Sequence, residues 1–169
     1  MASAQGLSQL DQEEFAAALE GVFEHSPWIA LRAWKLRPFD SRAALLAALC
    51  GVIQQASRAE QQKLVCAHPE LAGKAAVRGE LTEESTREQA AARLDACTPE
   101  EFERLQDLNA AYREKFGFPF IIAVRGLSRT QIIEQFSARL ENGQETEFQE
   151  ALRQIEKIAA LRLQERVEE

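Results

Sequence analysis

Helix start signals recur along the chain, and each is followed by apolar residues at helical spacing. Ser57 and Glu60 have the spacing of a capping box, and Thr98-Pro99 places an N-cap residue directly before a proline that can begin a helix. Further candidate N-caps are Asp11, Ser26, Ser41, Thr82 and Ser128. We expect an all-α fold in one domain over residues 1–169, built as a bundle of about eight helices.

Several of these signals also predict helix boundaries and burial. Ser26 is expected to cap a helix that begins at the next residue, a proline. The helix after Ser41 is apolar on nearly all sides, which predicts a central and buried position. Thr82 should begin a helix that extends to Cys97, and the last helix is expected to begin at Thr146.

Residues 116–124, "FGFPFIIAV", break the helical pattern. They are apolar, aromatic and β-branched, with a glycine and a proline inside. We expect this irregular segment to be extended and buried, without a partner sheet. Its backbone N–H and C=O groups then need other partners. Those partners could be side chains and water in a core connection, or a planar ligand with amide-like groups.

Composition and charge narrow the possible partners. The net charge of −7 and the pI of about 5.1 argue against nucleic acid, which requires basic patches. The N-terminal residues lack the features of a signal peptide, and the most apolar run, 43–53, is shorter than the ~20 residues of a membrane span. We expect a cytoplasmic protein with no membrane partner. Cys50, Cys66 and Cys97 are expected to be reduced, buried thiols.

The stretch "CAHPELAGK" contains His68, one of the two histidines of the chain. Pro69 disfavours helical geometry at the residue before it, so His68 should lie just past a helix C-terminus, which favours a protonated imidazole. His68 could cap that helix, with Lys74 exposed, or it could be placed for acid–base chemistry.

Two other kinds of site are excluded at the level of single residues. "LAGK" is not a phosphate-binding P-loop, because the position five residues before Gly73 is His68 and Ala75 follows the lysine. His25 and His68 have no metal-binding spacing, and the cysteines are scattered. We therefore expect no metal site, and His25 is interpreted as a helix flank.

The stretch "STREQ" places a hydroxyl, a carboxylate and an amide on one helix face. Ser85, Glu88 and Gln89 stand at i, i+3 and i+4, whereas Thr86 and Arg87 face elsewhere. The three groups could bind a polar heterocycle, or they could form a solvated helix face.

Taken together and in this order, these stretches resemble the 2-oxo-4-hydroxy-4-carboxy-5-ureidoimidazoline (OHCU) decarboxylases of urate breakdown. The resemblance covers nearly the whole chain, from "FEHSPWIALRAWKLRPF" through "HPELAGK", "STREQAAARLD" and "KFGFPFIIAVRG" to "IEKIAALRL". "HPxLAG", "SxxEQ" and "FGFPFI" are weak signals singly, but their combination is specific.

The resemblance implies a cofactor-free, all-α lyase that is commonly a homodimer and converts OHCU into (S)-allantoin and CO₂. It makes His68 the catalytic histidine, with Glu88 sharing the acid–base work. The substrate-binding residues that it implies are Pro69, Ser85, Thr86, Arg87, Glu88, Gln89, Phe120, Ile121, Ile122, Ala123, Val124 and Arg162. Without the resemblance, Arg162 would be interpreted as an ordinary surface arginine between two leucines.

Two alternatives to the decarboxylase stay open at this point. One is a hydrolase of a related ureido compound, in which Glu88 would activate water. The other is a non-enzymatic helical adaptor, in which "HPELAGK" and "FGFPFI" serve packing or docking. For the enzyme we expect a closed polar pocket in which His68, Glu88 and Gln89 converge.

Overall fold

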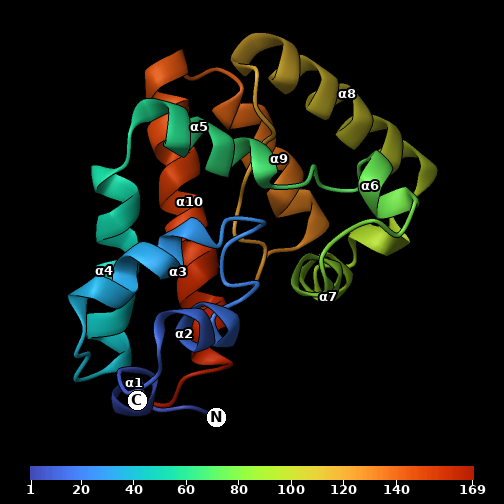
Figure 1. Cartoon of the computed structure of the whole chain (residues 1–169). Coiled ribbons are helices and arrows are strands. Elements are labelled where there is room, and N and C mark those ends of the chain that lie inside the picture. Colours follow the sequence, from blue (N-terminus) through green and yellow to red (C-terminus); the bar gives the residue numbers. More distant parts are fainter. The chain divides into compact units, whose positions relative to one another are not determined.

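A computed structural model describes the backbone of residues 1–169 and all side chains except those of Lys74 and Ala75, so the expected exposure of Lys74 lies outside the described residues. The helices are α1 (Ala4–Leu7), α2 (Gln12–Ala18), α3 (Trp28–Ala33), η1 (Trp34–Leu36), α4 (Arg42–Gln55), α5 (Arg58–Ala67), α6 (Lys74–Val77), α7 (Glu83–Ala91), η2 (Leu94–Ala96), α8 (Pro99–Phe116), α9 (Arg129–Arg139) and α10 (Gln144–Gln164) (Figure 1). The only pairing of strand type in the described residues is an isolated bridge between Ala2 and Val167. The prediction of an all-α fold is confirmed.

The chain divides into two compact units. Residues 1–64 together with 156–169 form the first unit, and residues 65–155 form the second. In the first unit, α3 packs against α2 and α4, and its fully buried side chains include Phe15, Ile29 and Leu45. The single domain over residues 1–169 stays a prediction.

The core of the second unit is a cluster of aromatic rings around Tyr112 of α8. The ring centroid of Tyr112 lies 4.5 Å from Phe116, 5.4 Å from Phe120 and 5.7 Å from Phe136. Phe120 and Phe136 stack with centroids 3.8 Å apart and planes inclined by 8°. The edge-to-face pairs of Tyr112 with Phe120 and Phe136 stabilise a core beyond their buried area. They fix the irregular segment 116–124 between α8 and α9.

Most helix boundaries follow from the N-cap residues that the sequence predicts. Capping boxes close at Asp11, Thr98 and Ser128, where each side chain accepts a hydrogen bond from the backbone N–H three residues on. Ser57 and Glu60 bond to one another's backbone in the same way before α5. Capping side chains satisfy N–H groups that would otherwise have no intrahelical acceptor, so these starts depend on local sequence alone.

Two predicted helix starts are wrong. The Ser26 hydroxyl donates to the Glu24 carbonyl at 2.8 Å, and α3 begins at Trp28 with Pro27 as its N-cap residue. At the other end of the chain, α10 begins at Gln144, two residues before Thr146. Two acidic residues, Glu145 and Glu147, stand in its first turn, where the helix dipole favours negative charge.

The predictions for α4 and α7 also need correction. Of α4, only one stripe of three side chains is buried, because its exposed positions include alanines, which are apolar but small enough to stand in water. α7 ends at Ala91 and does not extend to Cys97. Arg93 adopts a left-handed conformation with φ of 61°, which interrupts the helix before η2.

The cysteines are free thiols, but their predicted burial is wrong. Cys66 is exposed, and Cys50 and Cys97 are half-buried. Desolvation, with a contribution from Glu156, raises the pKa of Cys50 to about 12. Among the described residues, no helix combines the length and hydropathy needed to cross a bilayer.

A pair of glycines tests the boundary of α8. Gly117 has φ of 78° at the C-terminal cap, whereas Gly51 lies inside α4, and a Cβ would meet nothing within 4 Å at either position. We expect Gly117→Ala to lower the free energy of unfolding by about 1 kcal/mol and Gly51→Ala to raise it by roughly 0.5–1 kcal/mol. Urea denaturation of both variants measures the two signs. Equal effects would contradict the left-handed cap at Gly117.

Candidate active site

His68 lies directly after the last residue of α5, as the sequence predicts. Its backbone N–H donates to the Val65 carbonyl at 3.3 Å, and Pro69 follows. The residue is only 7% exposed, and its Nε2 atom is buried. Burial restricts the positions that the imidazole can take, and a positioned imidazole can serve as a general acid or base.

The turn that follows His68 is held by three side-chain amides. Gln89 of α7 accepts from the Ala72 N–H at 3.0 Å and donates to the Glu70 carbonyl at 3.3 Å. From α8, Gln106 donates to the Ala72 carbonyl at 2.8 Å and Asn109 donates to the Leu71 carbonyl at 2.9 Å. These bonds satisfy backbone N–H and C=O groups of the turn, which lie outside any helix and so have no intrahelical partner.

The backbone of this turn is also tightly constrained. Ala72 adopts φ of 49°, an uncommon left-handed conformation for a residue with a side chain. A Cβ at Gly73 would lie 2.8 Å from the Glu70 Cβ, so only glycine fits there without a shift. The hydrogen bonds from α7 and α8 hold this conformation in place.

A cleft of about 760 Å³ lies beside the histidine. It is lined by His68, Pro69, Glu70, Gln106, Asn109, Ala110, Arg113 and Glu114. Arg113 Nε donates to the Glu70 carboxylate at 2.7 Å across this surface. The α8 residues were not identified from the sequence. Three of them, Gln106, Asn109 and Arg113, stand at i, i+3 and i+7. This line of polar side chains on one helix face is the signal that could have revealed them.

The residues of α7 lie as their helical spacing predicts, but they do not line this cleft. The cleft is therefore not the closed polar pocket expected from the sequence, in which His68, Glu88 and Gln89 converge. Ser85 and Gln89 are buried, Glu88 is half-buried, and Thr86 and Arg87 are exposed. The Thr86 hydroxyl donates to the Thr82 carbonyl at 2.9 Å. Gln89 contacts the turn after His68 through its two hydrogen bonds to Glu70 and Ala72. Together with Thr86 it also lines an apolar hollow of about 490 Å³.

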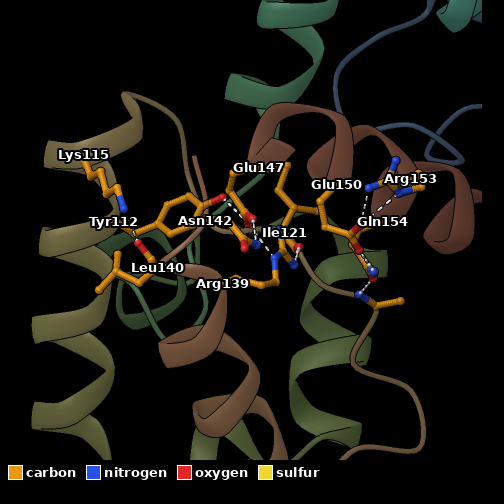
Figure 2. A network of polar contacts seen from close by, with 11 residues as sticks. Tyr112, Lys115, Ile121, Arg139, Leu140, Asn142, Glu147, Glu150, Arg153 and Gln154 are labelled. Atoms are coloured by element: carbon orange, nitrogen blue, oxygen red, sulfur yellow. Dashed lines mark hydrogen bonds and ion pairs between the residues drawn. The ribbon is translucent and has the colours of Figure 1, made fainter. Parts of the chain in front are cut away.

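The irregular segment is buried, as expected, and side chains bond to part of its backbone. Arg139 Nη1 donates to the Ile121 carbonyl at 2.6 Å, and the Ala123 N–H donates to Gln154 Oε1 at 3.0 Å (Figure 2). The Val124 carbonyl accepts from Leu127 N–H at 3.0 Å. Residues Phe120, Ile121, Ile122, Ala123 and Val124 are each at most 7% exposed. The remaining backbone groups of the segment are compatible with either side chains and water or a planar ligand as partners. The Ile121 carbonyl, the Ala123 N–H and the Val124 carbonyl are already bonded within the protein.

Arg162 belongs to the first unit and is not an ordinary surface arginine. It is 3% exposed, and its Nη2 donates to the Glu24 carboxylate at 2.9 Å while Nη1 donates to the Gly21 carbonyl at 2.9 Å. Glu24 is 1% exposed. Glu24 was not identified from the sequence. A glutamate next to two apolar residues in "GVFEHSPW" is the signal that could have identified it.

Among the described residues, no three histidine, cysteine, aspartate or glutamate side chains are placed to hold a metal ion together.

With the geometry established, the chain can be compared with known proteins. The family model of OHCU decarboxylase matches residues 8–164. The 2-oxo-4-hydroxy-4-carboxy-5-ureidoimidazoline decarboxylase of Halalkalicoccus jeotgali is 44% identical over 159 residues, which cover 94% of this chain and 88% of that protein. The protein of the same name from Haloferax volcanii is 41% identical over 162 residues, covering 96% and 94% of the two chains.

A solved structure is similar as well. The crystal structure of (S)-allantoin synthase matches with a TM-score of 0.81 at 30% identity, covering 99% of this chain. This chain spans 54% of the length of that one. The chain belongs to the OHCU decarboxylase family. The resemblance identified from the sequence is confirmed, and so is the expectation of an enzyme of the carboxy-lyase class.

The buried pair of Glu24 and Arg162 gives a stability prediction. Removing one partner of a buried ion pair leaves an uncompensated charge, whereas replacing both with apolar residues is often neutral. We expect Glu24→Gln to lower the free energy of unfolding by about 3 kcal/mol and the double variant Glu24→Leu/Arg162→Met to lower it by less. Urea denaturation of the single and double variants checks this order. A Glu24→Gln protein as stable as the parent would contradict the buried pair.

Proposed function

We propose that the chain catalyses the decarboxylation of OHCU to (S)-allantoin and CO₂ in urate breakdown. The observation that carries this proposal is a buried histidine at the end of α5, beside a cleft, in a chain of the OHCU decarboxylase family. The name of the similar crystal structure, (S)-allantoin synthase, supports the product.

The substrate itself supplies the electron sink for this reaction. The carbon that bears the carboxylate also bears a hydroxyl group and stands next to a carbon–nitrogen double bond. When the bond to the carboxylate breaks, its electron pair moves toward that imine and leaves an enediol-like intermediate. The former imine nitrogen takes up a proton, and the adjacent carbon takes up another at one face. The hydroxyl group loses its proton and becomes a carbonyl, so the net change is the loss of CO₂ and the uptake of one proton. The protein has to hold the substrate and deliver a proton to one face of the adjacent carbon.

The residues take the roles that the resemblance implies. We assign the proton transfer to His68 and a share of the acid–base work, or the orientation of the substrate, to Glu88. We propose the polar groups of Ser85 and Gln89, the ring of Pro69 and the backbone of Phe120–Val124 for substrate binding. Gln89 then acts in two ways, because its amide also holds the turn after His68. Thr86, Arg87 and Arg162 complete the proposed binding set, on the resemblance alone.

The hydrolase and the adaptor are less well supported than the decarboxylase. The family match and the identity of 41–44% to proteins named as decarboxylases favour carboxyl loss. Product analysis separates the two chemistries, because a decarboxylase releases CO₂ and a ureido hydrolase releases ammonia or urea.

The assembly and location are also proposals. We infer a homodimer from the resemblance, and sedimentation equilibrium should give twice the chain mass of 18.9 kDa. A single-chain mass at micromolar concentration would exclude it. We infer a cytoplasmic location from the free thiols, which suit a reducing compartment. Recovery of the activity in the soluble fraction of disrupted cells would support it, and recovery with membranes would oppose it.

The role of His68 gives the central prediction. OHCU generated freshly from urate should be converted to (S)-allantoin, followed by circular dichroism, and His68→Asn should lower turnover by on the order of 10²–10⁴. The helical signal of the variant should be retained, because the amides of α7 and α8 hold the turn through its backbone.

His25→Asn is the matched control for this experiment. His25 is the other histidine, is exposed and has φ of 46°, a conformation that asparagine tolerates well. Its variant should keep the parental rate. A folded His68→Asn protein with that same rate would mean that the histidine only caps α5.

A further inference from the structure

Arg139 of α9 is a buried guanidinium that the proposed chemistry does not use. It is 8% exposed, and its Nε donates to the Glu147 carboxylate at 2.6 Å. On the other side, its Nη1 donates to the Ile121 carbonyl, and its Cζ lies 4.4 Å from the centre of the Phe120 ring. One side chain therefore joins a buried carboxylate to the backbone of the irregular segment, as Figure 2 shows.

Glu147 fixes the guanidinium in turn. This carboxylate is fully buried and accepts from the Tyr112 hydroxyl at 2.7 Å and from Asn142 Nδ2 at 3.0 Å. Burial, together with the hydrogen bond to Glu147, raises the pKa of Tyr112 well above its usual range, so the phenol stays a donor. Donors from α8, from α9 and from the turn before α10 thus hold one carboxylate, and the carboxylate sets the position of Arg139.

The stability of the folded protein alone does not explain why a buried Arg139–Glu147 ion pair stands at this position. Buried ion pairs can often be replaced by apolar residues of similar volume without loss of stability. Arg139 also keeps one buried nitrogen, Nη2, without a hydrogen-bond partner among the described residues. The arginine instead fixes the orientation of the Ile121 carbonyl, because its planar guanidinium bonds the Glu147 carboxylate and that carbonyl at once. A lysine ammonium on its flexible side chain does this less well.

A second side chain fixes the same stretch two residues further on. Gln154 of α10 accepts from the Ala123 N–H, and its own Nε2 donates to Glu150 Oε1 at 2.8 Å. The carbonyl of Ile121 and the N–H of Ala123 are thus both tied to neighbouring helices. With these two groups bonded, the directions of the peptide groups between them are restricted.

We propose that Arg139, set by Glu147, is a positioning residue for substrate binding, with Gln154 as its counterpart at Ala123. By holding the Ile121 carbonyl it fixes the remaining backbone groups of Phe120–Val124 toward the substrate. This inference rests on the proposed function, which assigns that segment to binding. A positioning residue of this kind affects KM more than kcat, since the proton transfer belongs to His68.

Arg139→Lys is the test, and Arg129→Lys is the matched control. Arg129 is on the same helix and also joins a glutamate to a backbone carbonyl, with Nε 3.0 Å from Glu101 Oε2 and Nη1 3.1 Å from the Arg93 carbonyl. We expect Arg139→Lys to raise KM for OHCU by on the order of tenfold, the loss of about one backbone hydrogen bond, with kcat changed much less. Arg129→Lys should leave both constants near the parental values.

Hydrogen exchange provides a readout that does not depend on the reaction. Amides within residues 120–124 should exchange faster in Arg139→Lys than in Arg129→Lys, while the amides of α8 keep their protection. If the parent protein does not form (S)-allantoin, the proposed function fails, and the exchange comparison still tests the positioning role. Should Arg139→Lys not fold, Gln154→Leu replaces it, with the same expected rise in KM and in exchange.

The outcomes are distinct. A rise in KM with faster exchange in the segment supports the positioning role. A folded Arg139→Lys or Gln154→Leu protein with parental KM and parental exchange overturns it, even if its thermal stability is lower, because the side chain would then act only in folding.

Discussion

The fold of the second unit depends on the buried carboxylate of Glu147. The Glu147 carboxylate is completely buried, and a bare carboxylate there would be very unfavourable, so its donors have to be present for the unit to form. Those donors are the Tyr112 hydroxyl, the Arg139 guanidinium and the Asn142 amide, from three separate places in the sequence. The aromatic cluster surrounds the same point, since Tyr112 contributes its ring to the cluster and its hydroxyl to the carboxylate. Packing and polar satisfaction therefore favour one arrangement of α8, α9 and the start of α10.

The sequence predicts well what is decided locally. N-caps such as Thr98 and Ser128 need only a side-chain oxygen and the next three residues, and their helices begin where expected. Contacts between distant residues are predicted poorly. Arg139 and Glu147 stand among other charged residues on helices with exposed faces, and nothing in their immediate neighbours distinguishes them from surface residues. Their burial follows from where α8 and the irregular segment lie, which is a tertiary property.

In the candidate site, too, features decided by local sequence were predicted and contacts between distant residues were not. The position of His68 after α5 follows from the proline beside it, and the common face of Ser85 and Gln89 follows from helical spacing. The support around the histidine does not, because Gln106 and Asn109 belong to α8, which begins only at Pro99. Reading Gln89 only as a substrate-binding residue also missed its structural role. The Gln89 amide bonds to Glu70 and Ala72, and it thereby connects α7, which carries proposed binding residues, to the turn after His68.

The close approach of Gly73 to Glu70 has a consequence for how such sequences are interpreted. A motif like "HPELAG" is usually valued for its histidine, but its last residue is required by steric exclusion rather than by chemistry. A related chain that kept the glycine and replaced the histidine would still form the turn and would lack the proposed acid–base group. The presence of the glycine therefore indicates the conformation of the turn, whereas the proposed proton transfer depends on the imidazole.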